Sequence, residues 1–291
     1  MNKIQTLLTT TVLLFGISGS GFAGYSEAKK AYNIGDFSTA LKEYKIGAQQ
    51  GDVKAQHNLG IMYGSGKAGS VNNKKAFYWF EKAAINNFAE SQRSLAIMYL
   101  QGMGVEEDTI TGMYWLKKAA NNNLMNAQAL LGNIYATSKY VKPDAIKSTR
   151  WRIKAANQGD LKSQRSVHGA YRFGYGVTVD KVRSIKFLEA AAAQNDKRSI
   201  HDLAMIYKSI NADQFGLITD YNKAKSLFEK AADLGSEESL GELAGMYIFG
   251  IGVDKNMLKA KELIQKTLLS KDVKIQEKAQ KKWDDFELWK Y

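Results

Sequence analysis

A tyrosine returns at a nearly fixed interval along this chain, and this repeat restricts the fold more than any other sequence feature. From the first marker onward the interval is 36 residues four times and then 40 residues. Chains with a fixed internal period fold as stacked copies of one small unit, each burying its apolar face against its neighbours. The markers are Tyr63, Tyr99, Tyr135, Tyr171, Tyr207 and Tyr247.

Each copy has the pattern of two helices joined by a glycine turn. Positions equivalent to Ala55, Leu59 and Tyr63 are apolar at i, i+4 and i+8, which places them on one stripe of a helix. The sequence Gly-Met-Gly-Val at residues 102–105 then ends the helix, because glycine readily adopts a positive φ. The period therefore predicts an all-α solenoid of helix-turn-helix repeats.

The second helix of each hairpin has its own start signal. One position of the period holds Asn or Asp in all seven hairpins, and these side chains cap the free N–H groups at a helix start. We therefore interpret this set as helix caps and not as scattered acidic ligands. The residues are Asp36, Asn72, Asp108, Asp144, Asp180, Asp220 and Asn256.

The ends of the chain differ from the repeats. An apolar run near residues 7–17, followed by Gly21 and Ala23, is typical of an export signal, and it is too short for a stable membrane span. We expect cleavage after Ala23 and residence in the periplasm, with secretion as the alternative. The predicted division is a signal over 1–23, a first hairpin over 24–53, six repeats over 54–272 and a capping helix over 273–291.

The capping helix is expected over about residues 273–290. It closes the array, because a repeat array needs a terminal element with one apolar and one polar face. One side of it is predicted to be apolar, and exposed tryptophans used for docking are the functional alternative. The apolar residues are Ile275, Ala279, Trp283, Phe286 and Trp289.

The composition excludes several kinds of chemistry. The chain has no cysteine, which rules out disulfides, thiolate metal sites and cysteine nucleophiles. His57 and His201 occupy the same position four repeats apart, on the order of 30–40 Å at the usual helix spacing, too far to share a metal ion. We predict no catalytic residue, no metal site and no cofactor, and we expect the chain not to be an enzyme.

Three repeated segments together resemble the Sel1-like repeat, a variant of the tetratricopeptide repeat. They are Leu-Gly-Ile-Met-Tyr at residues 59–63, the turn at 102–105, and Trp-Leu-Lys-Lys-Ala-Ala at 115–120. The resemblance implies a right-handed α/α superhelix that serves as a protein-binding scaffold. Exported bacterial scaffolds of this kind resemble regulators, envelope assembly factors, or immunity proteins that neutralise secreted toxic effectors.

Positions that vary between the copies are the candidates for partner binding. In tetratricopeptide-type arrays the first helices line the concave surface, and their non-core positions vary with the ligand. Two such positions form stripes on one face that are mostly basic in the middle of the chain; an ordinary solvated face is the alternative interpretation. The candidate residues are Lys54, His57, Arg93, Lys162, Arg165, Arg198 and His201.

The charge is also uneven along the chain. Residues 139–186 contain 12 basic and 3 acidic side chains, a charge that favours capture of an acidic protein and that weakens with salt. Export argues against a nucleic-acid partner, and no basic amphipathic segment predicts a stable membrane anchor. We therefore expect a periplasmic scaffold that binds an acidic protein; an immunity protein against a toxin such as a phospholipase is the alternative.

The fifth repeat carries four extra residues in the loop 208–221. Longer loops on a regular scaffold often make contacts. The apolar residues Phe215, Leu217 and Ile218 within it predict either a contact patch or packing over the neighbouring turn.

Overall fold

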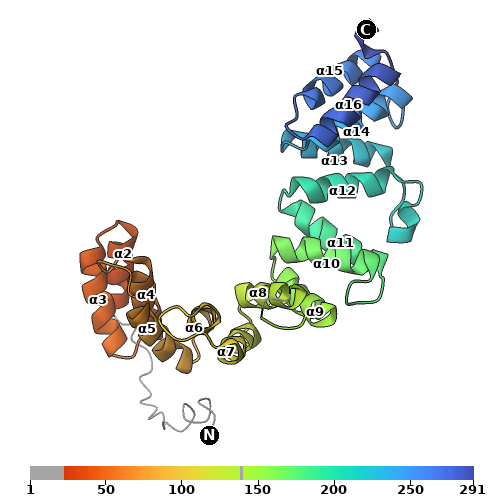
Figure 1. Ribbon diagram of the computed structural model, residues 1–291. Helices are drawn as coiled ribbons and strands as arrows, with labels where there is room; N and C mark the ends of the chain where they lie inside the picture. The colour runs from red at the N-terminus through yellow and green to blue at the C-terminus, as the bar shows by residue number, and fades with distance from the viewer. Residues whose placement is uncertain (1–22, 138–139) are drawn as a thin grey trace. The chain divides into compact units, whose positions relative to one another are not determined.

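A computed structural model describes residues 23–137 and 140–291, which form fifteen α-helices and two short 3-10 helices with no strand among them (Figure 1). The all-α fold class predicted from the repeat is confirmed. The predicted export signal, apart from Ala23, lies outside the described residues.

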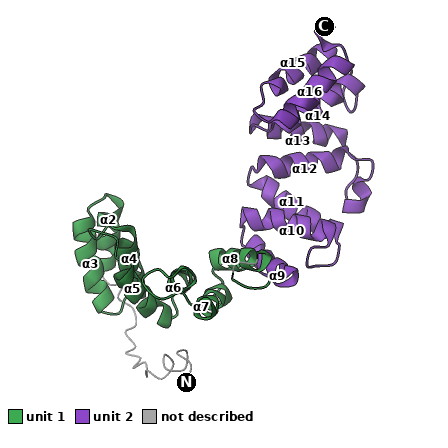
Figure 2. Cartoon of the chain, viewed as in Figure 1, with its two compact units in different colours: residues 1–143 green, residues 144–291 purple. Residues whose placement is uncertain are grey.

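The chain divides into two compact units at Pro143 (Figure 2). Within each unit, every helix packs on the next one in sequence, as expected for stacked hairpins. Unit 1 holds α2 Ala23–Asn33, α3 Phe37–Gln49, α4 Val53–Ser65, α5 Asn73–Ile85, α6 Ala89–Gln101, α7 Thr109–Asn121 and α8 Met125–Ala136.

Unit 2 continues the same order of first and second helices, with one 3-10 helix in the extended loop and one at the end. Its elements are α9 Ala145–Asn157, α10 Leu161–Phe173, α11 Lys181–Ala193, α12 Lys197–Lys208, η1 Ala212–Phe215, α13 Tyr221–Asp233, α14 Glu237–Phe249, α15 Met257–Leu268, α16 Val273–Asp285 and η2 Leu288–Lys290.

The seven Asn and Asp residues predicted as caps do cap the second helices. In every hairpin the side-chain oxygen accepts a hydrogen bond of 2.8–3.0 Å from the backbone N–H three residues later. Each bond satisfies one of the donors that a helix start leaves without an internal partner. The capping prediction is confirmed.

His168 occupies a position where the other repeats have glycine or alanine, and this exchange predicts packing that is either looser or shifted. The packing is not loose, because the ring is buried and its Nδ1 lies 2.8 Å from the Ser184 hydroxyl on α11. A small hydroxyl opposite the ring leaves it room and also gives it a hydrogen-bond partner. The repeat thus replaces a small-residue contact with a buried polar pair.

The sequence predicts that the extended loop of the fifth repeat either forms a contact patch or packs over the neighbouring turn, and its residues divide between packing and exposure. Phe215 and Leu217 pack against the hydrophobic core of unit 2, and Ala212 is fully buried. Ile218 is instead 85% exposed. The loop therefore covers the neighbouring turn and still presents an apolar side chain to solvent.

The C-terminal helix is shorter than predicted. α16 ends at Asp285, Glu287 adopts a left-handed conformation, and the chain continues as η2. This break changes which side chain faces inward, so Leu288 is fully buried while Trp289 is 51% exposed. The prediction that Trp289 continues the apolar side of this helix is wrong.

Candidate functional site

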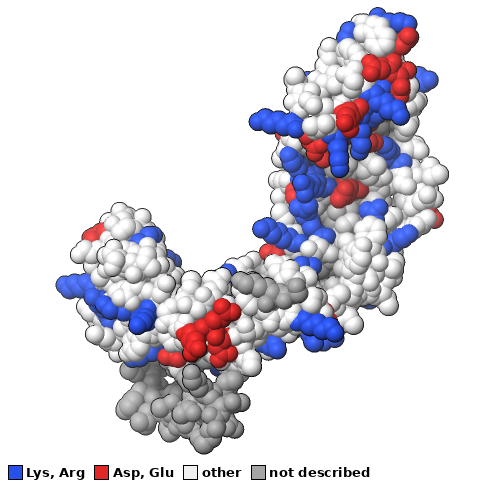
Figure 3. Space-filling view, viewed as in Figure 1, with Lys and Arg blue, Asp and Glu red and all other residues white. Residues whose placement is uncertain are grey.

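Four basic residues lie where α10 and α12 begin, and we call them the basic edge. They are Lys162, Arg165, Lys197 and Arg198. The Arg165 guanidinium lies 3.6 Å from the carboxylate of Asp196, which caps α12, so the starts of the two helices are neighbours. Figure 3 shows Lys and Arg side chains gathered along one edge of unit 2, over α10 to α14.

Lys197 belongs to this edge although the sequence did not single it out. Its ammonium donates a hydrogen bond of 2.7 Å to the Gly235 carbonyl, in the turn before the next first helix. Lys162 and Arg198 are exposed. The edge thus has two residues in internal contacts, Arg165 and Lys197, and two whose side chains extend into solvent.

Two acidic residues at this edge cap the helices themselves. Asp160 accepts from the backbone N–H of Ser163, and Asp196 accepts from that of Ser199. A carboxylate at a helix start is stabilised by the helix dipole and cannot move to neutralise a distant lysine. Both carboxylates are therefore held at the helix starts, while Lys162 and Arg198 remain exposed.

The two candidate histidines, His57 and His201, each contact a serine of the next repeat. His57 lies 2.8 Å from the Ser91 hydroxyl, and His201 lies 2.9 Å from the Ser239 hydroxyl, in each case one repeat further on. Burial lowers the pKa of His57 to about 4, which leaves this ring neutral near pH 7. Its ring also packs against Phe80 and Phe88 at 5.4 and 5.2 Å. A partner would meet His57 as a neutral, partly covered ring.

The remaining candidates lie on unit 1. Lys54 is exposed at the start of α4, and Arg93 is partly buried on α6. The Arg93 Nε is buried, and no hydrogen-bond acceptor lies near it within the described residues. Arg165 holds the equivalent position in unit 2, and its guanidinium lies beside the Asp196 carboxylate. In unit 1 the residue equivalent to Asp196 is Leu124, which offers Arg93 no carboxylate.

The sequence did not predict the role of the glutamines that open four of the repeats. Each donates from Nε2 to the carbonyl oxygen eight residues earlier, at 3.1–3.2 Å, and so ties a first helix to the end of the preceding one. The repeated small-Gln pair is the sequence signal for this contact. The residues are Gln56, Gln92, Gln128 and Gln164.

A small cavity of about 230 Å³ lies between α12, α14 and α16. Lys282 donates a hydrogen bond of 2.6 Å to the Gly241 carbonyl, and burial lowers the pKa of this lysine. Burial raises the pKa of Glu242, but the ion pair with Lys208 outweighs this and lowers it overall. The charges in this cavity are thus balanced within the protein.

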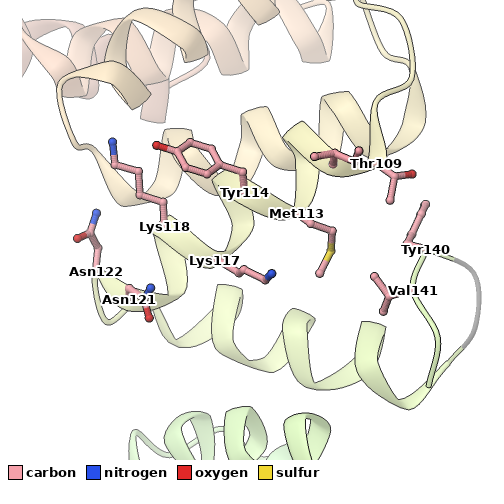
Figure 4. A pocket seen from close by; sticks show the side chains of 10 residues that line it. Thr109, Met113, Tyr114, Lys117, Lys118, Asn121, Asn122, Tyr140 and Val141 are labelled. Atoms are coloured by element: carbon pink, nitrogen blue, oxygen red, sulfur yellow. The ribbon is translucent and has the colours of Figure 1, made fainter. Parts of the chain in front are cut away.

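An open depression of about 750 Å³ lies on unit 1 beside α7. Figure 4 shows Met113 and Lys117 on one side of it, with Tyr140 and Val141 across from them. Its lining mixes apolar and amide groups with lysines and holds no acidic side chain. No group of three or more His, Asp or Glu side chains in the described part of the chain is placed to hold a metal ion.

The Sel1 repeat family matches six segments of the chain, residues 53–88, 89–124, 126–160, 169–196, 201–236 and 238–268. The chain therefore belongs to the Sel1 repeat family, and the resemblance seen in the sequence is confirmed. The Sel1 repeat is a non-catalytic scaffold fold typical of protein–protein interaction.

Two solved structures are similar to this chain. One is c5321, a protective antigen present in uropathogenic Escherichia coli strains, with 32% identity, a TM-score of 0.65, and coverage of 77% of this chain and 47% of that chain. The other is a Sel1 repeat protein from Oxalobacter formigenes, with 28% identity, a TM-score of 0.61, and coverage of 83% and 97%. This chain thus spans about half the length of c5321.

A third structure is more distant. The immunity protein Pa5087 from Pseudomonas aeruginosa has 17% identity and a TM-score of 0.40, and the match covers 72% of this chain and 82% of that chain. A likeness at that level says nothing about what this chain binds. No curated protein matches the sequence.

Proposed function

We propose that this chain is an exported, non-enzymatic scaffold that binds an acidic protein partner through the basic edge of unit 2. The supporting observation is the surface charge at the starts of α10 and α12, where Lys162 and Arg198 extend into solvent. Export to the periplasm is part of the proposal and is supported by the predicted signal at the start of the chain.

The physical basis is a positive field that two features reinforce. Lysine and arginine side chains supply the formal charges, and the first helices direct the positive ends of their dipoles to the same edge. Such a field raises the rate at which an acidic surface is captured and loses strength as salt screens it. Partner carboxylates would meet Lys162 and Arg198 first, because Lys197 donates to the Gly235 carbonyl and Arg165 lies beside Asp196.

The test is capture of the partner from periplasmic extract on the immobilised chain. We expect the pair Lys162→Glu and Arg198→Glu to lower recovery about tenfold or more, because both changes reverse the field where the partner first arrives. Lys186→Glu with Lys230→Glu is the matched control, since it makes the same change in net charge at exposed positions on second helices.

Equal recovery with both pairs would contradict the basic edge as the binding surface. Binding that does not weaken at high salt would also count against an electrostatic interface. The identity of the captured protein separates the scaffold from the immunity alternative, because a toxic effector that loses activity on binding would support the latter.

A further inference from the structure

A second surface lies at the opposite end of the unit 2 hairpins, where α10 and α12 end and the next helices begin. We call it the turn edge. Large apolar side chains are exposed there, with Tyr175 at 64% and Ile218 at 85% exposure. Single exposed apolar residues are ordinary, whereas a contiguous group marks an interaction site. The group consists of Phe173, Tyr175, Val179, Val182, Ile210 and Ile218.

Contacts link the turn after α10 to η1 and to the start of α11. The rings of Phe173 and Tyr175 lie 5.9 Å apart. The Arg172 guanidinium lies 5.3 Å from the Phe173 ring and 5.5 Å from the Phe215 ring, which bridges the turn to η1. Gly216 lies against Val182, so the loop also meets the start of α11.

Basic side chains outnumber acidic ones around the turn edge, where Asp213 on η1 is also exposed. Arg172, Lys181 and Arg183 flank the apolar side chains, and Arg183 is exposed with its guanidinium 3.2 Å from the Asp180 carboxylate. Asp180 and Asp220 are the caps of α11 and α13, where their oxygens accept backbone N–H groups. The turn edge is thus an apolar surface with a basic rim.

The most exposed apolar residues of the turn edge lie on the extended loop, and one of them, Ile218, borders an open depression of about 730 Å³. Ile210 and Ile218 lie just before and just after the inserted 3-10 helix and are 81% and 85% exposed. Side chains of this kind insert into the boundary between lipid headgroups and acyl chains, where tyrosine and phenylalanine rings also partition, while arginine and lysine reach the phosphates. Anionic headgroups complement the basic rim.

We propose that the turn edge docks reversibly onto an anionic phospholipid bilayer. A first helix of about 13 residues separates this edge from the basic edge by on the order of 20 Å. Unit 2 can therefore contact lipid at one end of its hairpins and leave the basic edge open to a protein at the other. No helix in the part of the chain that the structure describes is long and apolar enough to cross a bilayer, and the docking proposed is peripheral.

The experiment measures co-sedimentation of the chain with vesicles. The chain starts at Gly24, so that the apolar run at residues 7–17 cannot itself bind lipid. We expect binding to vesicles of phosphatidylethanolamine with phosphatidylglycerol, and much less to phosphatidylcholine alone. Tyr175→Ser with Ile218→Ser should lower the partition coefficient about tenfold or more.

The matched control removes exposed apolar side chains from the other end of the hairpins. Leu269 and Val273 are 83% and 63% exposed, so Leu269→Ser with Val273→Ser changes similar surface away from the turn edge. This control should bind as the unaltered chain does. Lys181→Gln with Arg183→Gln should weaken binding to the anionic vesicles by on the order of tenfold and leave phosphatidylcholine binding unchanged.

A site-specific probe gives a second readout. Because the chain has no cysteine, Ile218→Cys and Leu269→Cys each allow one environment-sensitive fluorophore to be attached. Anionic vesicles should shift the emission of the Ile218 label to shorter wavelength and leave the Leu269 label unchanged. The proposal would be overturned if both labels shifted equally or if both serine pairs lost binding equally. It would also be overturned if the unaltered chain did not bind vesicles, and that result would assign the turn edge to a protein partner.

Discussion

The second glycine of each G-x-G-V turn has a contact that the first glycine lacks. A Cβ placed on Gly104 would lie 2.4 Å from the Asn73 carbonyl oxygen, at the start of the preceding second helix. The same close approach occurs at Gly176, where the Ala145 oxygen would be 2.1 Å away. A Cβ on Gly102 would meet nothing closer than 3.6 Å. Both glycines of the turn have positive φ, and only the second one also touches the neighbouring hairpin.

This difference predicts unequal costs for two alanine substitutions in one turn. Gly102→Ala should lower the free energy of unfolding by about 1–2 kcal/mol, the cost of a left-handed conformation. Gly104→Ala should cost more, about 2–4 kcal/mol, because the backbone of Asn73 must also move. Urea unfolding followed by circular dichroism measures both. Equal destabilisation would show that the contact between hairpins carries no cost.

At the scale of elements, the end of the array shows how a helix break selects the buried side chain. α16 covers α15, with Ala279 and Leu288 in the core and Trp283 and Phe286 packed beside them. Because the helix stops at Asp285, the following 3-10 turn rotates Leu288 inward and Trp289 outward. The smaller side chain closes the core, and the larger one faces solvent.

Truncating the smaller residue, Leu288, should therefore destabilise the protein more than truncating the larger residue, Trp289. Leu288→Ala should lower the free energy of unfolding by about 2–5 kcal/mol, the usual cost of a cavity at a fully buried leucine. Trp289→Ala should change it by less than about 0.5 kcal/mol. Thermal unfolding of the two variants against the unaltered chain gives the comparison. A larger effect at Trp289 would contradict the packing of η2.

At the scale of the molecule, each unit has hydrophobic clusters of its own. One large cluster runs through unit 2 from Ile185 to Leu288. The clusters around Tyr44 and Phe80 belong to unit 1. Stability in such arrays is approximately a sum of contributions from each repeat and from contacts between neighbouring repeats, so a part with several repeats can fold alone.

The fragment 144–291 is therefore expected to fold by itself. It begins at the residue that caps α9 and contains the whole of unit 2, including the helix that covers its end. Far-ultraviolet circular dichroism should show a helical spectrum, and heating should give a cooperative transition. A fragment without such a transition would show that unit 2 depends on unit 1 for its stability.

The helices and caps were predictable because their causes are local. A cap such as Asp108 bonds the N–H of Thr111, three residues away, and a glycine such as Gly102 ends a helix through its own φ. Because the period is 36 residues, the same local signal can be compared in seven copies within one chain. The hairpins and capping residues could therefore be predicted correctly before any contact between hairpins was known.

The candidate binding residues depend on neighbours that lie far along the chain. Arg93 and Arg165 hold the same place in the repeat. Arg165 lies beside Asp196, 31 residues away, whereas the Arg93 Nε has no hydrogen-bond partner among the residues that the structure describes. His57 occupies a position that varies between repeats, as a binding residue would, but its ring contacts Ser91 and its burial keeps it neutral near pH 7.

The sequence by itself determined the solenoid, since period, capping and turn chemistry all act within about one hairpin. Only the tertiary structure decided which charges remain open to a partner and which apolar side chains reach solvent. Those properties depend on how hairpins stack, and stacking places Asp196 beside one arginine and Leu124 at the matching position for another. Burial and charge pairing are set across repeats, beyond the range of any local signal.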